Sequence, residues 1–193
     1  MKTLEEKRAV SKWFGDSANW LVLFVQSRDE QRVVNYLKPK LNPDKYVTFI
    51  PTRDFAFNKG RRKIEIQQKP WLRGYVFIVA LVDEVECLNT VIPLISLHSS
   101  VYCLLPNGEG MSRILLSAHD KSVMMSLLDE NFNIPAVESI FVDKKVQITD
   151  ETFKGKFGKV KYIDKHKRYA IIELELFDTL VKCEVMLDII NAA

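Results

Sequence analysis

The feature that most constrains the fold is a change of pattern near residue 131 of this 193-residue chain. Before it, short apolar runs typical of strands alternate with helical patterns. The strand-like runs are 20–25, 46–50, 75–80 and 101–105, and the helical patterns are 27–37, 83–95 and a stretch from residue 117. After it, only strand patterns follow, at 145–148, 158–163, 169–176 and 181–187. This order predicts an α+β sandwich of helices on a mostly antiparallel sheet, followed by a small all-β barrel.

The same patterns predict where the domains begin and end. We expect an N-terminal extension over 1–18, an α+β domain over 19–131, a linker over 132–139 around Pro135, and a barrel over 140–193.

Two local features of the α+β domain predict particular structures. Ser27 and Glu30 have the spacing of a capping box at the start of a helix. Residues 53–73 are basic and polar and predict a long hairpin or loop.

Several classes of protein are excluded by composition. No apolar run approaches the roughly 18 residues of a membrane-spanning helix, and the N-terminus has no signal-peptide pattern, so we expect a cytoplasmic protein. Cys87, Cys103 and Cys183 are widely spaced in apolar runs and are expected to be buried thiols. The histidines have no partner at metal-ligand spacing. Without a glycine-rich phosphate loop or a nucleophile motif, we expect no metal, no cofactor and no enzymatic activity.

The small net charge of +3 conceals two strongly basic segments. Residues 53–73 carry seven basic and two acidic side chains, which gives +5, and residues 154–168 carry seven and one, which gives +6. The rest of the chain must therefore carry −8. Clustered cations of this kind are typical of phosphate contacts with nucleic acid, although charged runs are also common in solvated loops.

The segment Val142–Val160 has the most specific local pattern in the chain. A charged turn leads into a strand, then into a loop that contains Phe153, Gly155 and Gly158, and then into a second strand. The glycines fit positions that need a positive φ or a close backbone approach. The segment resembles a KOW motif, the core of a small SH3-like barrel in transcription and ribosomal proteins. It departs from that motif at Glu151-Thr152, where a Gly-Pro pair is usual.

A second motif lies in the first part of the chain. The runs Trp20–Val25 (WLVLFV) and Lys69–Ile78 (KPWLRGYVFI) resemble two strands of the N-terminal (NGN) domain of NusG-family transcription elongation factors. Trp71-Leu72-Arg73 stands where the family usually has Leu-Phe-Pro. The order of an NGN domain, a short linker and one KOW barrel also matches, and the resemblance covers residues 19–190.

The resemblance implies a docking surface for RNA polymerase. In this family, one face of the NGN sheet carries an apolar patch that binds the clamp helices of the largest polymerase subunit. Strand aromatics are more often core residues on sequence alone. Alternation nevertheless places Tyr75 and Phe77 on one face. By position, Phe24, Tyr75 and Phe77 match the family's patch, with Trp71 and Leu72 expected at its border. These five are the residues expected to bind polymerase.

Within the family, Lys161–Phe177 is similar to LoaP-type antiterminators, in which a basic turn precedes an alternating Ile/Glu strand. That resemblance implies a monomer that binds the hairpin of a leader RNA. The residues expected to contact RNA are Lys59, Arg61, Arg62, Lys63, Arg73, Lys154, Lys156, Lys159, Lys161, Lys165, His166, Lys167 and Arg168. The alternatives are a general NusG-like elongation factor, an RfaH-like or UpxY-like paralog, and a ribosome-associated KOW protein.

Overall fold

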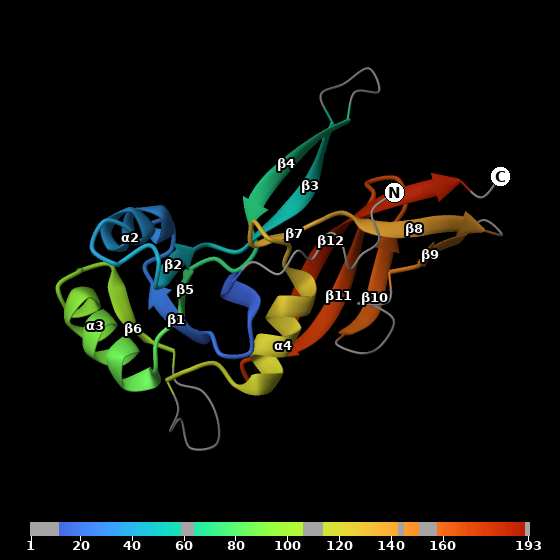
Figure 1. Ribbon diagram of the computed structural model, residues 1–193. Helices are drawn as coiled ribbons and strands as arrows, with labels where there is room; N and C mark the ends of the chain where they lie inside the picture. Colours follow the sequence, from blue (N-terminus) through green and yellow to red (C-terminus); the bar gives the residue numbers. More distant parts are fainter. Residues whose placement is uncertain (1–11, 59–63, 106–113, 143–144, 151–157, 192–193) are drawn as a thin grey trace. The chain divides into compact units, whose positions relative to one another are not determined.

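The computed structural model describes residues 12–58, 64–105, 114–142, 145–150 and 158–191 (Figure 1). The chain divides into two compact units. Unit 1 is Met1–Pro51 with Leu72–Met125, and unit 2 is Thr52–Trp71 with Ser126–Ala193. The segment 52–71 therefore groups with the C-terminal part of the chain, although the sequence predicted that it belongs to the α+β domain over 19–131.

Unit 1 is built on a four-stranded sheet of order β2-β5-β1-β6. Its strands are β1 (Asn19–Val25), β2 (Tyr46–Phe49), β5 (Tyr75–Ala80) and β6 (Val101–Leu104). Both β2 and β1 pair antiparallel with β5, and β6 pairs antiparallel with β1. All four predicted strands are thus confirmed, as is the antiparallel sheet.

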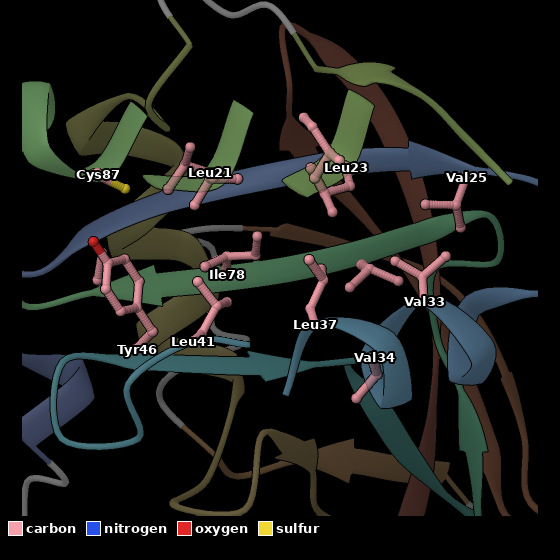
Figure 2. Close-up of a cluster of buried hydrophobic side chains, with 14 residues drawn as sticks. Leu21, Leu23, Val25, Val33, Val34, Leu37, Leu41, Tyr46, Ile78 and Cys87 are labelled. Carbon is pink, nitrogen blue, oxygen red and sulfur yellow. The ribbon is translucent and has the colours of Figure 1, made fainter. Parts of the chain in front are cut away.

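Helices α2 (Glu30–Leu37) and α3 (Glu84–Ser96) pack on one face of this sheet. Figure 2 shows side chains of β1, β5 and α2 pointing toward one another in the core. Leu21, Leu23 and Val25 lie at every second position of β1, so all three point into this core. A short 3₁₀-helix, η1 (Lys12–Phe14), precedes β1.

The third helix, α4 (Ala118–Leu127), forms where Ser117 was expected to cap it. The Ser117 hydroxyl accepts a hydrogen bond from the backbone N–H of Asp120 at 3.0 Å. Its predicted core face is buried, at Val123, Met124, Leu127 and Leu128. None of the helices among the described residues is long and apolar enough to cross a membrane.

The predicted capping box of α2 is wrong. The helix begins at Glu30, and Asp29 occupies the N-cap position without a side-chain hydrogen bond to the helix. Glu30 is buried, and its Oε1 accepts a hydrogen bond from the Gly74 backbone N–H at 2.6 Å. A long-range contact thus takes the carboxylate that the local pattern assigned to a cap.

Unit 2 contains a five-stranded sheet of order β10-β11-β12-β8-β9. The strands are β8 (Val137–Val142), β9 (Lys145–Ile148), β10 (Gly158–Asp164), β11 (Tyr169–Leu176) and β12 (Thr179–Asn191). The predicted strands are confirmed. β8 was not predicted, and it pairs parallel with the end of β12. Phe177 and Asp178 both have φ of 56° in the two-residue turn between β11 and β12.

Gly158 has the close backbone approach predicted for it. A Cβ atom at this position would lie 2.6 Å from Leu174 Cδ2 and 2.7 Å from Ile172 Cγ2, both in the buried row of β11. Any side chain would therefore collide with the core of the sheet. Gly155 lies outside the described residues.

The basic segment 53–73 forms a hairpin of β3 (Thr52–Asn58) and β4 (Ile64–Pro70), which was one of its two predicted forms. The segment 132–139, expected to be a linker, instead contains β7 (Asn133–Ile134) and the start of β8. β7 pairs parallel with β3. The Asp54 carboxylate accepts hydrogen bonds from Asn133 Nδ2 at 2.9 Å and from the Ala136 N–H at 3.1 Å.

Candidate functional site

Three aromatic rings meet at an exposed end of the unit 1 sheet, and we refer to Phe24, Tyr75 and Tyr102 as the aromatic patch. Phe24 is opposite Tyr75 in the β1–β5 pairing, and their ring centroids are 5.6 Å apart. The Tyr102 ring lies 5.4 Å from Phe24 on the other side. Phe24 is 39% exposed and Tyr102 is 59% exposed. A cluster of exposed aromatic rings is suited to binding a protein partner.

The turn before β5 fixes Tyr75 in this patch. Gly74 has φ of +80°, a conformation that favours glycine, and its carbonyl oxygen accepts a hydrogen bond from the Val25 N–H at 2.8 Å. A Cβ on Gly74 would lie 3.6 Å from the Phe24 ring. The hydrogen bond from the Gly74 N–H to the buried carboxylate of Glu30 holds the turn from the other side. The turn is therefore secured by both β1 and α2.

Of the five residues predicted to bind polymerase, two lie in the aromatic patch, namely Phe24 and Tyr75. Trp71 is partly buried and lies in the bend between β4 and β5. The prediction that Phe77 is exposed is wrong, because its ring is fully buried and stacks on Phe49 at 5.4 Å. Leu72 is also buried.

Phe77 is buried and Tyr75 is partly exposed, although both lie on the same face of the sheet, because other side chains cover only one end of that face. The Phe77 end is filled by rings, since Trp20 packs edge-on against Phe49 at 5.8 Å and Phe49 stacks on Phe77. Along β1, both faces are buried until Phe24, where the second face opens. Strand alternation predicts the face that a residue occupies, but not where along the strand that face is covered.

Tyr102 was missed by the sequence analysis, although its strand was predicted. The signal that could have found it is an aromatic residue in a short strand, but the sequence does not show that this strand pairs with β1.

The position of β6 at the edge of the unit 1 sheet also explains an error about the cysteines. Cys103 is exposed, whereas Cys87 and Cys183 are buried as expected. Burial raises the pKa of the Cys87 thiol to about 11 and that of Cys183 to about 12.

In unit 2, residues 164–168 between β10 and β11 form the basic turn. Asp164 Oδ1 accepts hydrogen bonds from the N–H groups of Lys167, at 2.9 Å, and His166, at 3.0 Å. These bonds, that from Lys167 foremost, lower the pKa of Asp164. Arg168 has φ of 54°, and its carbonyl oxygen accepts a hydrogen bond from the Leu187 N–H. The turn is thus ordered, and Lys165, His166 and Lys167 are exposed on it.

The other residues predicted to contact RNA are divided between the two units. Lys159 and Lys161 are exposed on β10, next to the basic turn, and Lys161 pairs with Glu173 at 2.7 Å. Arg73 is exposed in unit 1, in the turn that precedes Tyr75. Lys159, Lys161 and residues 165–168 therefore follow one another along β10 and the basic turn of unit 2, whereas Arg73 belongs to unit 1. Lys59, Arg61, Arg62, Lys63, Lys154 and Lys156 lie outside the described residues.

Comparison with known proteins agrees with this architecture. Residues 18–133, more than half of the chain, match the family described as "Transcription termination factor nusG". A solved structure titled "Domain interaction in Thermotoga maritima NusG" is similar, with a TM-score of 0.51 and 18% identity. The match covers 88% of this chain and 93% of that chain. No curated protein matches.

The fold is thus an NGN α/β domain followed by a KOW-like β half-barrel. Because residues 18–133 match its family model, the chain belongs to the NusG family: it is a transcription elongation or termination factor and not an enzyme, and its membership implies that it binds RNA polymerase.

Proposed function

We propose that this protein is a specialised processive antiterminator. It docks on the clamp helices of RNA polymerase through the NGN domain over residues 19–131, and it binds the hairpin of a leader RNA through the KOW domain over 140–193. Such a protein acts in the cytoplasm, as a monomer, on a polymerase that is transcribing. The observation that supports docking is the aromatic patch, and the one that supports RNA binding is the basic turn.

Docking is proposed to act by shifting a conformational equilibrium of the polymerase. A protein that binds the closed clamp more tightly than the open clamp stabilises the closed form. Because termination proceeds through paused states, a polymerase held in the closed form terminates less often. The aromatic patch provides the affinity, since aromatic anchors in a desolvated contact contribute most of the binding free energy of an interface.

Docking can be tested by truncating the patch. Phe24→Ala and Tyr102→Ala are each expected to weaken binding to RNA polymerase by about tenfold or more, as measured by biolayer interferometry. Leu180→Ala is the matched control, because Leu180 is an exposed apolar residue of unit 2. Affinity that is unchanged in both patch variants would contradict docking through this surface.

RNA binding can be tested by removing two cations of the basic turn. Lys165→Gln with Lys167→Gln is expected to weaken binding of a stem-loop RNA and to reduce the slope of log affinity against log salt by about one to two. Arg32→Gln with Lys38→Gln removes two exposed cations of unit 1 and is the matched control. An unchanged affinity and salt slope in the basic-turn variant would argue against this RNA contact.

The antiterminator branch is tested by transcription in vitro through a terminator, with and without a leader RNA hairpin upstream. Readthrough that requires the leader supports the proposal. Readthrough or pausing that is equal on both templates supports a general NusG-like factor or an RfaH-like or UpxY-like paralog without hairpin specificity.

A further inference from the structure

Tyr162 is an exposed aromatic side chain on unit 2 to which the proposed function assigns no role. It lies on β10, two residues before the basic turn, and is 49% exposed. Its ring lies 5.9 Å from that of Tyr169 on β11, at an interplanar angle of 48°. The Tyr169 ring contacts one side of Tyr162, and much of the Tyr162 surface remains open to solvent.

A β-bulge places Tyr162 on the outer face of the sheet. Gly158 and Val160 are opposite Leu174 and Ile172, which belong to the buried row of β11. With regular alternation, residue 162 would continue that inward row. The register shifts between Val160 and Tyr162, so Tyr162 is opposite Ile171 instead, in the row that faces away from the core.

Three carboxylates on β10, β11 and β12 already have partners. Glu173 forms an ion pair with Lys161 at 2.7 Å. Glu184 of β12, which is opposite Ile171 in the β11–β12 pairing, forms an ion pair with Arg53 at 2.9 Å. The Asp164 carboxylate is engaged by the backbone of the basic turn. These pairings reduce the repulsion that a phosphate group would meet on this face.

Exposed cations lie on the chain on both sides of the ring. Lys159 precedes Tyr162 on β10, and Lys167 follows it in the basic turn. An aromatic ring between cations fits single-stranded nucleic acid, because a base stacks on the ring while the flanking phosphates approach the cations. Sequence-specific RNA recognition commonly uses unpaired bases of loops and bulges in this way, since the deep groove of A-form RNA excludes side chains.

We propose that Tyr162 is a stacking site for one unpaired base of the bound RNA, with Tyr169 as its support and the basic turn as the phosphate contact. This inference rests on the proposed RNA binding and names the part of the RNA that this surface takes. It distinguishes a loop or bulge nucleotide from the paired stem.

The test compares Tyr162→Leu, which keeps an apolar side chain, with Tyr162→Phe, which keeps the ring. The probes are a stem-loop RNA with an adenosine loop, the same stem-loop with abasic loop positions, and a blunt duplex with the stem sequence. Tyr162→Leu is expected to weaken binding of the adenosine stem-loop by about tenfold, within the range measured for loss of one stacked base. Tyr162→Phe is expected to bind like the wild type. Neither variant should change binding of the abasic stem-loop or the duplex.

A fluorescent base analogue gives a direct signal of stacking. With 2-aminopurine in the loop, the wild type and Tyr162→Phe should quench its fluorescence, and Tyr162→Leu should not. Leu97→Ala is the control and should quench like the wild type, because Leu97 is an exposed apolar residue of unit 1 outside the aromatic patch.

The possible failures are distinguishable. Tyr162→Leu that binds the adenosine stem-loop as tightly as the wild type would overturn the stacking site. A loss of affinity in Tyr162→Leu that is equal for the adenosine and abasic stem-loops would also overturn it, because such a loss would come from a backbone contact or from unfolding. A wild-type protein that binds none of the three RNAs would instead refute the proposed RNA binding itself.

Discussion

At the scale of single residues, Glu30 matches a local helix-capping pattern but instead accepts a hydrogen bond from a turn that is distant in the sequence. Glu30 begins α2, yet its buried carboxylate binds the Gly74 N–H across 44 positions of sequence. That hydrogen bond helps to hold the turn that places Tyr75 beside Phe24. A buried N–H that loses its acceptor costs about 1–3 kcal/mol, so Glu30 is expected to be a positioning residue for the aromatic patch.

Glu30→Ala should therefore lower the free energy of unfolding by about 1–3 kcal/mol and weaken polymerase binding several-fold, because the Gly74 turn loses one of its two supports. Glu30→Gln keeps an acceptor oxygen and should retain most of both properties. The measurements are urea unfolding and binding to RNA polymerase, with Glu84→Ala as the exposed control on α3. An alanine variant with normal stability and affinity would mean that the Val25–Gly74 hydrogen bond suffices.

At the scale of elements, the basic turn shows how an acidic residue organises a cationic surface. The Asp164 carboxylate accepts hydrogen bonds from the Lys167 and His166 N–H groups and so orders a turn that carries the cations Lys165, Lys167 and Arg168. Removing its charge would weaken the turn, since charge-assisted hydrogen bonds are stronger than neutral ones. The order of the turn should consequently depend on pH.

The direction of this pH dependence follows from the lowered pKa of Asp164. The folded state stabilises the carboxylate, so its contribution is complete above the ordinary pKa of 3.8 and is lost as the pH falls through the lower folded value. The amide NMR shifts of Lys167 and His166 should therefore titrate with a midpoint below 3.8. In Asp164→Asn this acid transition should be absent. A midpoint at or above 3.8 would contradict a carboxylate held by these bonds.

The hairpin is the element whose place the sequence predicted least well. The basic and polar residues 53–73 predicted a hairpin or a loop, but they did not indicate which segment the hairpin pairs with. Thr52 and Arg53 pair with Asn133 and Ile134 of β7, and Arg53 forms an ion pair with Glu184 of β12. These contacts join segments about 80 to 130 positions apart, and no local pattern encodes such pairing.

At the scale of the whole molecule, one segment belongs to a different unit from the residues that flank it in the chain. Residues 52–71 lie between two parts of unit 1 in sequence and belong to unit 2 in structure. Regions that open together share a free energy of local unfolding. The amides of β3 and β4 should therefore follow the stability of unit 2 rather than that of unit 1.

Gly158→Ala tests this division. The added Cβ would collide with Leu174 and Ile172, and overpacking of this kind costs roughly 1–3 kcal/mol. Hydrogen exchange measured by mass spectrometry should accelerate in β11, β12 and the β3–β4 hairpin, and remain unchanged in β1 and β5.

Val91→Ala, a cavity variant in the core of unit 1, should give the opposite pattern. If the hairpin amides follow Val91→Ala instead, the hairpin belongs energetically to unit 1.

The sequence by itself determined the class of the fold, the four strands of the unit 1 sheet, helices α2 to α4, strands β9 to β12, the family, and the two basic segments. It could do so because periodicity, caps such as Ser117, turn residues and glycine positions are local properties of the chain. It also indicated Phe24 and Tyr75 as surface residues through the family resemblance.

Only the tertiary structure decided which of those aromatic rings are exposed and which residues join them. Phe77 and Tyr75 share a face, but rings from β1 and β2 cover one and not the other. Tyr102 enters the patch because β6 pairs with β1, and Tyr162 faces outward because one bulge shifts its register. Coverage, strand pairing and register depend on contacts between distant segments, so they are set by packing and not by local pattern.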